Sequence, residues 1–228
     1  HRDLHRVDRR QRQMCIRDRV QISLDKFEEV GQRFITKLWN ACKFVISGLE
    51  DASPVEEEAE ASLEDRWILG QLDECVRQVR VAFEIFQFNE ALACLQRFFW
   101  DDFCDWYIEL AKPRLREGSC AEKRRAWRTQ VEVLAALLRL FHPVTPFITE
   151  ELWQHLHKRL TFSGLIKLLP AELHQAWVCA LAPYPRDEGR YNAVAAKEFA
   201  LLQSAVRAMR NVRARSGIGA GAELSVLV

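Results

Sequence analysis

Apolar side chains recur through residues 88–115 at the spacing of an α-helix. Each step along the row is three or four residues, about 3.6 on average, which keeps side chains on one helix face. The members of the row are Leu92, Leu95, Phe99, Phe103, Trp106 and Leu110, widened on one flank by Trp100 and Tyr107. Other helices must cover so apolar a stripe, so the row predicts the core of a helical bundle.

Acidic residues form a second row on the same predicted helix. Asp102, Asp105 and Glu109 follow one another at helical spacing. Acid–base catalysis would need a nucleophile or a metal beside them, and no His or Cys completes the row. The row therefore favours carboxylates that pair with arginine on a neighbouring helix over a catalytic cluster.

The composition agrees with an all-α fold. A chain of 228 residues that is 49% apolar can bury a sizeable core, and only 9 Gly and 7 Pro argue against a β-sandwich. The formal net charge is +1, so any surface for nucleic acid must be local. No apolar run approaches the roughly 20 residues that span a bilayer, so no membrane partner is expected.

The cysteines predict reduced thiols rather than disulfides or a metal site. They are seven in number and form no C-x-x-C pair: Cys15, Cys42, Cys75, Cys94, Cys104, Cys120 and Cys179. We therefore expect a cytoplasmic protein. His155 and His157 are two residues apart on a predicted helix and cannot face one metal together. No phosphate-binding or nucleophile motif is present, so we expect no cofactor and no catalytic residue within this chain.

The chain divides into four predicted segments. Residues 1–19 hold seven Arg and three acids and resemble translated adapter sequence, so we interpret them as non-native or disordered, with an RNA-binding arm as the alternative. Residues 20–158 form the bundle, and 159–189, with three prolines, form an irregular connection. Residues 190–228 carry a further helix and the first strand, 224–228, of a truncated small α/β element.

Local signals place the helix boundaries within these segments. Capping residues predict helices that start after Ser23, Ser62, Asn89 and Thr145. Residues 116–120 are predicted to turn into the fourth helix, which ends at His142 and Pro143, and a sixth helix spans about 190–213. Acidic residues 51–61 form a linker between the first two helices. Pro113 predicts the end of the third helix.

The first helix, about 23–49, carries a candidate binding surface. Its core row is Phe27, Val30, Phe34, Leu38, Ala41 and Val45. On a helical wheel, an adjoining strip without acids holds Lys26, Arg33, Lys37, Asn40 and Phe44, which we call the basic strip. Cations neutralise phosphates, an amide reads a base edge and a ring stacks on a base, so the strip suits an unpaired nucleotide loop. A solvated helix face with a packed Phe44 is the alternative.

Arginines crowd the end of the sixth helix. Arg207, Arg210 and Arg213, followed by Arg215, are candidate contacts to an RNA backbone. A helix C-terminus also favours cations through its dipole, which is the alternative role for these residues.

Four ordered motifs resemble one known family. They are KLWNACKFV (37–45), LEDRWILGQL (63–72), FNEALACLQRFFWDDFCDWYIELAKPRL (88–115) and LLRLFHPVTPFITEELWQHL (137–156). Together they closely resemble the anticodon-binding region of valyl-tRNA synthetases, from about residue 22 to the end of the chain. The FCDWYIELAKPRL form resembles the valyl branch more than the isoleucyl or leucyl branches.

The resemblance implies particular contacts and partners. The family's anticodon-contacting segment maps onto Lys37, Asn40, Lys43 and Phe44, with Lys26 one face-length earlier. Lys43 lies away from the basic strip, and the family usually has arginine there, whose planar fork lysine does not reproduce. The implied partners are tRNA(Val) for this region, and valine and ATP with magnesium for a catalytic domain outside it. A monomer is expected.

The resemblance also implies that this region alone does not aminoacylate, because it lacks the family's catalytic signatures. Two further interpretations remain open at this stage. One is the anticodon-binding region of an isoleucyl-type enzyme. The other is a non-catalytic helical module that binds RNA or a protein, with Trp39, Trp67 and Phe44 as anchors.

Overall fold

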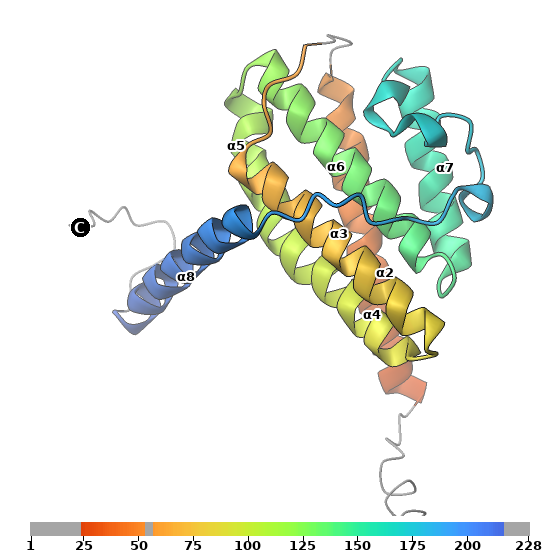
Figure 1. The fold of residues 1–228 in the computed structure, drawn as a ribbon, viewed down its shortest axis with the longest axis horizontal. Coiled ribbons are helices and arrows are strands. Elements are labelled where there is room, and N and C mark those ends of the chain that lie inside the picture. The colour runs from red at the N-terminus through yellow and green to blue at the C-terminus, as the bar shows by residue number, and fades with distance from the viewer. Residues whose placement is uncertain (1–23, 53–56, 217–228) are drawn as a thin grey trace, which may run out of the picture. The chain divides into compact units, whose positions relative to one another are not determined.

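The structure is a computed structural model that describes residues 24–52 and 57–216, with side chains from residue 31 onward except Asp51. The chain divides into two compact units, His1–Asn40 and Ala41–Val228, and the boundary falls within the first described helix. Figure 1 shows the second unit as packed helices, with no strand among the described residues. The predicted all-α bundle is confirmed, whereas the predicted strand at 224–228 and the segment 1–19 lie outside the described residues.

Helices account for most of the described chain. They are α2 (Leu24–Gly48), α3 (Leu63–Glu84), α4 (Phe88–Arg97), the π-helix η2 (Phe98–Ile108), α5 (Glu109–Glu117), α6 (Cys120–Phe141), α7 (Pro146–Phe162) and α8 (Ala193–Arg215). Short 3₁₀ turns are η1 (Leu49–Asp51), η3 (Ile166–Leu168), η4 (Ala171–Leu173) and η5 (Cys179–Leu181). The predicted boundaries of the larger segments, at 158 and 190, remain predictions.

Capping explains where several helices begin. The Ser62 hydroxyl accepts from the Asp65 backbone N–H, and the Asp65 carboxylate accepts from the Ser62 N–H in return. The same reciprocal box opens α6 through Ser119 and Glu122. These contacts satisfy backbone donors that an α-helix leaves unpaired at its start. The predicted start after Ser62 is confirmed, and residues 116–120 do lead into a helix. The predicted start after Asn89 is wrong, because α4 already begins at Phe88.

The segment 88–117 winds as one continuous helical path, but its middle is a π-helix. In η2 each backbone N–H donates to the carbonyl five residues earlier, instead of four residues earlier as in an α-helix. Such winding is rare over a segment of this length. The wider turn puts adjacent pairs of side chains on the core face, so the buried set is broader than the predicted row. It comprises Ala91, Leu95, Phe98, Phe99, Phe103, Cys104, Tyr107, Ile108 and Ala111. Leu92, Trp106 and Leu110 are half-buried instead.

Pro113 does not end this path, contrary to the sequence-based expectation. It lies inside α5, which continues to Glu117. A proline removes one helical hydrogen bond, so packing must stabilise the turn that follows. Arg114, the next residue, provides that anchor by donating two hydrogen bonds to the buried carboxylate of Asp65, at 2.7 and 2.8 Å.

Asp65 joins three helices through one carboxylate. Its side chain is completely buried, and it accepts from Arg114 of α5 and from the Tyr107 hydroxyl of η2 at 2.7 Å. Burial acts to raise the pKa of Asp65, but these donors, with Arg114 the strongest, hold it below its ordinary value. The helix cap of α3 is therefore also a tertiary contact.

α6 lies at the centre of the second unit and contacts α3, α4, α5 and α7. It is buried nearly all round in its second half, as a central helix should be. Figure 1 shows α3 and α4 side by side next to α6. The acidic linker is tied to α6 as well, because Glu58 forms ion pairs with Arg124 at 3.4 Å and with Arg128 at 2.5 Å.

The irregular segment after α7 is held by hydrogen bonds rather than by regular structure. Trp153 Nε1 of α7 donates to the Ala176 carbonyl at 2.8 Å. Further along, Arg190 pairs with the buried Asp73 of α3 at 2.6 Å and with Glu132 of α6. The segment is therefore bound to both α3 and α6 before α8 begins.

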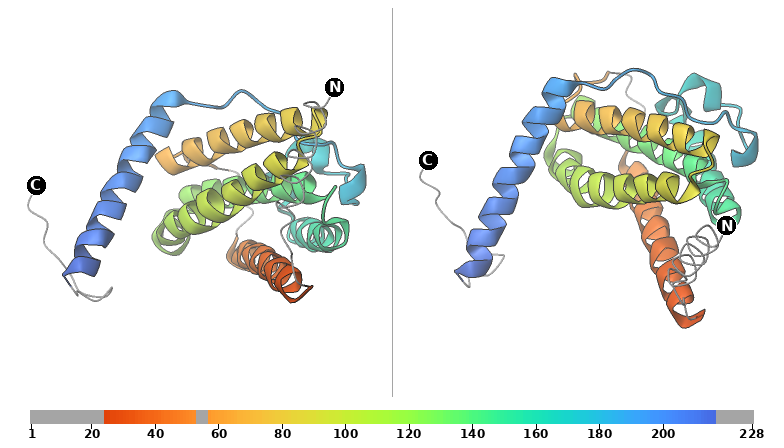
Figure 2. Two further views of the ribbon diagram at one scale, coloured as in Figure 1. Left: turned by 90° about the horizontal axis from the view of Figure 1, so that it is seen from below. Right: turned by 60° about the horizontal axis from the view of Figure 1, so that its bottom comes forward.

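Within the second unit, α8 packs against α3 and η2 through aromatic rings. Phe199 is fully buried and stacks on Trp67 of α3 at 3.6 Å between ring centroids, with Trp106 edge-on at 6.0 Å. Both views of Figure 2 show α8 starting beside the first turn of α3 and then running away from the other helices. Its later turns therefore remain largely exposed.

We predict that Arg114→Met lowers the free energy of unfolding by about 3–5 kcal/mol, because it leaves the buried Asp65 carboxylate without its cation. Urea denaturation measures the change. Arg116→Met, at an exposed position of the same helix, is the matched control and should cost less than about 1 kcal/mol. Equal losses in the two variants would contradict the role of Asp65.

The depressed pKa of Asp65 also sets a pH dependence. A carboxyl group whose pKa is lower in the folded state contributes its full stabilisation of the fold at pH values above its unfolded pKa of about 3.9. The contribution is lost as the pH falls from there through the folded pKa. The difference in unfolding free energy between wild type and Asp65→Asn should thus be constant above about pH 5 and shrink below about pH 4. A difference that grows on acidification would show that folding raises this pKa.

Candidate nucleic-acid interface

α2 separates a buried face from an exposed one. Leu38, Ala41, Cys42, Val45 and Leu49 are buried. This agrees with the predicted core row from Leu38 onward, and the buried face also includes Cys42 and Leu49. The side chains of Phe27 and Val30 lie outside the described part of the chain.

In the first unit, the basic strip falls mainly on the exposed face. Arg33 and Asn40 are exposed, and Lys37 is half-buried. Arg33 and Lys37 each also take part in interactions within the protein. Lys26 belongs to α2, but its side chain is outside the described residues. Three of the five predicted strip residues are therefore placed where a ligand can reach at least part of each side chain.

In the second unit, Phe44 and Lys43 are both accessible. Lys43 is exposed, and Phe44 is half-buried, so it is neither enclosed in the core nor fully in solvent. The Lys112 ammonium of α5 lies over the Phe44 ring, 5.6 Å from its centroid, in a cation–π contact. Lys112 also forms an ion pair with Glu109 at 2.5 Å. The ring is thus held at the surface with a cation beside it.

Lys112 is a candidate functional residue that the sequence analysis missed. It is 68 positions from Phe44 in the chain and carries no local signal that connects the two. Only the packing of α5 near the end of α2 brings its ammonium group to the ring. A lysine at that place adds positive charge to a surface suited to phosphates.

The arginines of α8 form a separate exposed group. Arg207 and Arg210 are exposed, and Arg213 is half-buried with an interaction of its own. The guanidinium of Arg210 lies 5.7 Å from the Trp106 ring centroid, which orients it on the surface of the bundle. Arg213 and Arg215 occupy the last turn of α8, where the helix dipole favours cations.

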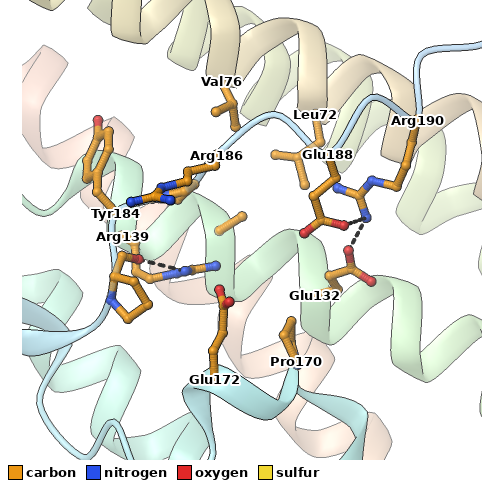
Figure 3. A pocket seen from close by; sticks show the side chains of 13 residues that line it. Leu72, Val76, Glu132, Arg139, Pro170, Glu172, Tyr184, Arg186, Glu188 and Arg190 are labelled. Atoms are coloured by element: carbon orange, nitrogen blue, oxygen red, sulfur yellow. Dashed lines mark hydrogen bonds and ion pairs between the residues drawn. The ribbon is translucent and has the colours of Figure 1, made fainter.

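A cavity of about 600 Å³ lies between α3, α6 and the irregular segment (Figure 3). Its charged side chains are balanced, with three arginines and three glutamates: Arg139, Arg186, Arg190, Glu132, Glu172 and Glu188. Arg190 pairs with Glu132 and Glu188, and Arg139 donates to the Pro183 carbonyl at 2.8 Å. These contacts hold the segment in place, so the cavity has no surplus charge that would attract a nucleotide.

The acidic row of the long helical path differs from the predicted pairing with arginines of a neighbouring helix at Glu109. Glu109 pairs with Lys112 on its own helix rather than with arginine on a neighbour, and burial raises the pKa of Asp102 to about 6. No group of His, Cys, Asp and Glu in the described residues could hold a metal ion. His157 is buried while His155 is exposed, in keeping with their predicted separation. Among the described helices, none has a long enough apolar stretch to cross a bilayer.

Comparison with known proteins identifies the bundle. The profile of the anticodon-binding domain of tRNA ligases matches residues 65–228. The chain belongs to this family. The family assignment agrees with the resemblance seen in the four sequence motifs.

Curated relatives are similar to most of this chain. A valine–tRNA ligase of Dehalococcoides mccartyi (strain CBDB1) is 41% identical over 191 residues, which cover 83% of this chain and 20% of that protein. Those of Thermotoga maritima and Treponema pallidum are 39% and 37% identical over 91% and 93% of this chain, and 22% of each relative. The chain thus spans about a fifth of the length of these relatives. A match over 93% of the chain leaves out too few residues to omit α2.

The partner-binding alternative loses one of its predicted anchors. Trp67 is buried and stacked on Phe199, so it cannot receive another protein. Trp39 is 40% exposed and has an interaction of its own, and Phe44 is already in contact with Lys112. Two exposed cations of α2, Arg33 and Lys43, favour RNA over a protein partner.

Proposed function

We propose that this chain binds the anticodon loop of a valine tRNA, as the anticodon-binding part of a valine–tRNA ligase. The observation that carries the proposal is the exposed or half-exposed set of cation, amide and ring on α2, in a chain of the anticodon-binding family. The relatives described above are valine–tRNA ligases, which favours the valyl over the isoleucyl interpretation.

Each side chain has a distinct role in this proposal. Lys37 and Arg33 neutralise phosphates of the loop, and the Asn40 amide donates to and accepts from a base edge. Phe44 stacks on an unpaired base, and its ring is positioned for this by Lys112. Lys43, which lies away from the basic strip, and Lys26 add positive charge to the same helix, and Lys112 keeps positive potential at the Phe44 ring.

The proposal places the chemistry elsewhere in the complete protein. Activation of valine with ATP and magnesium, and transfer to the tRNA, would belong to parts of the relatives that this chain does not span. The chain itself would recognise the tRNA and hold it in register. We propose a cytoplasmic, monomeric protein, because translation uses tRNA there and no second copy is required by the surface described.

We predict that Phe44→Ala combined with Lys37→Ala weakens binding of a valine tRNA by on the order of 10- to 1,000-fold. Stacking contributes roughly 1–3 kcal/mol per base, and removal of a cation that neutralises a phosphate weakens binding further. Filter binding across a salt series measures both the affinity and the slope of log K against log salt, which should fall in magnitude by about 0.7–0.9.

Two controls make this result specific. Lys158→Ala removes an exposed lysine of α7, far in sequence from the strip, and should leave the affinity nearly unchanged. Phe44→Tyr keeps a ring and should retain most of the binding, and urea denaturation of each variant checks that it remains folded. Wild-type affinity in the folded double variant would rule out the basic strip as the interface.

A second prediction concerns α8. Arg207→Ala with Arg210→Ala should weaken binding of valine tRNA and of a tRNA with a changed anticodon by the same factor, because phosphate contacts carry no sequence information. The salt slope should fall in magnitude by about 1 for each phosphate that an arginine no longer neutralises. Lys197→Ala, an exposed cation earlier on α8, is the control. Unchanged affinity and slope would rule out Arg207 and Arg210 as contacts to the RNA backbone.

A further inference from the structure

Two thiols meet where α3 packs against α4. The sulfur of Cys94 lies 3.7 Å from the sulfur of Cys75, and it lies 3.2 Å from Oε1 of Gln78, to which it donates. α3 and α4 pack against each other, so the sulfurs are held together by the bundle itself. Their contact requires no motion of the helices.

Cys94 is reachable from solvent, whereas Cys75 is not. Cys94 is half-buried and lines a surface pocket of about 320 Å³. Cys75 is only 3% exposed and lies behind Cys94. A small oxidant can therefore reach the first sulfur, and the second is protected behind it.

The surroundings also give the two sulfurs different acidities. Hydrogen bonding from Cys75 lowers the pKa of Cys94 to about 7, and the nearby Arg97 guanidinium adds to this. The same contact, together with burial, raises the pKa of Cys75. Buried Cys42 differs, because desolvation raises its pKa. A thiolate is the reactive form of cysteine, so Cys94 has nucleophilic character that Cys42 lacks.

We propose that Cys94 and Cys75 are a peroxide-reactive thiol pair that closes to a disulfide between α3 and α4. In the first step the Cys94 sulfur attacks a peroxide oxygen. An S–O bond forms and the O–O bond breaks, and the released hydroxide takes a proton to become water. The sulfur is oxidised to a sulfenic acid and the peroxide is reduced.

In the second step the Cys75 sulfur attacks the Cys94 sulfur. An S–S bond forms and the S–O bond breaks, and the leaving hydroxyl takes the Cys75 proton as a second water. One hydrogen peroxide and two thiols thus give one disulfide and two waters. A disulfide needs about 2.05 Å between sulfurs, so the pair must approach by less than about 2 Å, which side-chain rotation supplies. This proposal does not depend on the function of α2.

The experiment treats the full 228-residue chain with hydrogen peroxide, alkylates the remaining thiols in denaturant, and maps tryptic peptides without reduction. Cys75 falls in WILGQLDECVR (67–77) and Cys94 in VAFEIFQFNEALACLQR (81–97), so a bond between them links two separate peptides. We expect this linked species, lighter by two hydrogens than its reduced parts, to be the main product. Reduction before alkylation should restore both free peptides.

Matched variants isolate each step. Cys75→Ser should stop at a sulfenic acid on Cys94, trapped by dimedone on peptide 81–97. Cys94→Ser should give neither the link nor the adduct, and Cys120→Ser, which removes an exposed thiol, should leave the link unchanged. The proposal is overturned if both peptides stay unlinked and fully alkylated at a dose that oxidises Cys120. It is also overturned if Cys94 links mainly to the Cys120 peptide (117–123).

Discussion

The buried carboxylate of Asp65 is the contact on which the second unit depends. It closes the first turn of α3 by capping, and the same oxygens receive Arg114 and Tyr107 from a segment more than 40 residues away. A buried carboxylate without those donors would cost more than the whole cap contributes. Arg114 also keeps the chain helical past Pro113, and Lys112, which lies over Phe44, belongs to that same turn of α5.

Local chemistry explains which parts of this fold the sequence predicts well. Reciprocal capping at Ser62 and Ser119 involves residues three positions apart, so their helix starts can be recognised without knowledge of the fold. The π-winding of residues 98–108 cannot be recognised in this way. Six aromatic residues on one short segment satisfy a 3.6-residue repeat and a wider one equally well. Packing against α3 and α6 selects the wider turn, since it buries Phe98 beside Phe99 and Phe103 beside Cys104.

The candidate interface likewise has a part that the sequence predicts and a part that it does not. Periodicity alone separates the buried face of α2 from the exposed face that carries Arg33, Asn40 and Lys43, because one helix determines both. Lys112 could not be predicted, since its place beside Phe44 arises from the contact between separate helices. Glu109 pairs with Lys112 on its own helix and not with an arginine of a neighbouring helix. The arginine nearest to Glu109 in sequence, Arg114, already pairs with Asp65.

A net charge of +1 is compatible with an RNA-binding surface because many charges of this chain are used internally. Asp65, Asp73 and Glu58 each hold arginines in contacts that join helices or linkers. Those contacts take charges of both signs out of the field that a ligand meets. The exposed cations of α2 and α8 then act over distances of about 8–10 Å, which is the range that counts at physiological salt. Binding at such a surface is governed by where the exposed cations lie, whereas the internal ion pairs join α3, α5 and α6 with one another or with the segments beside them.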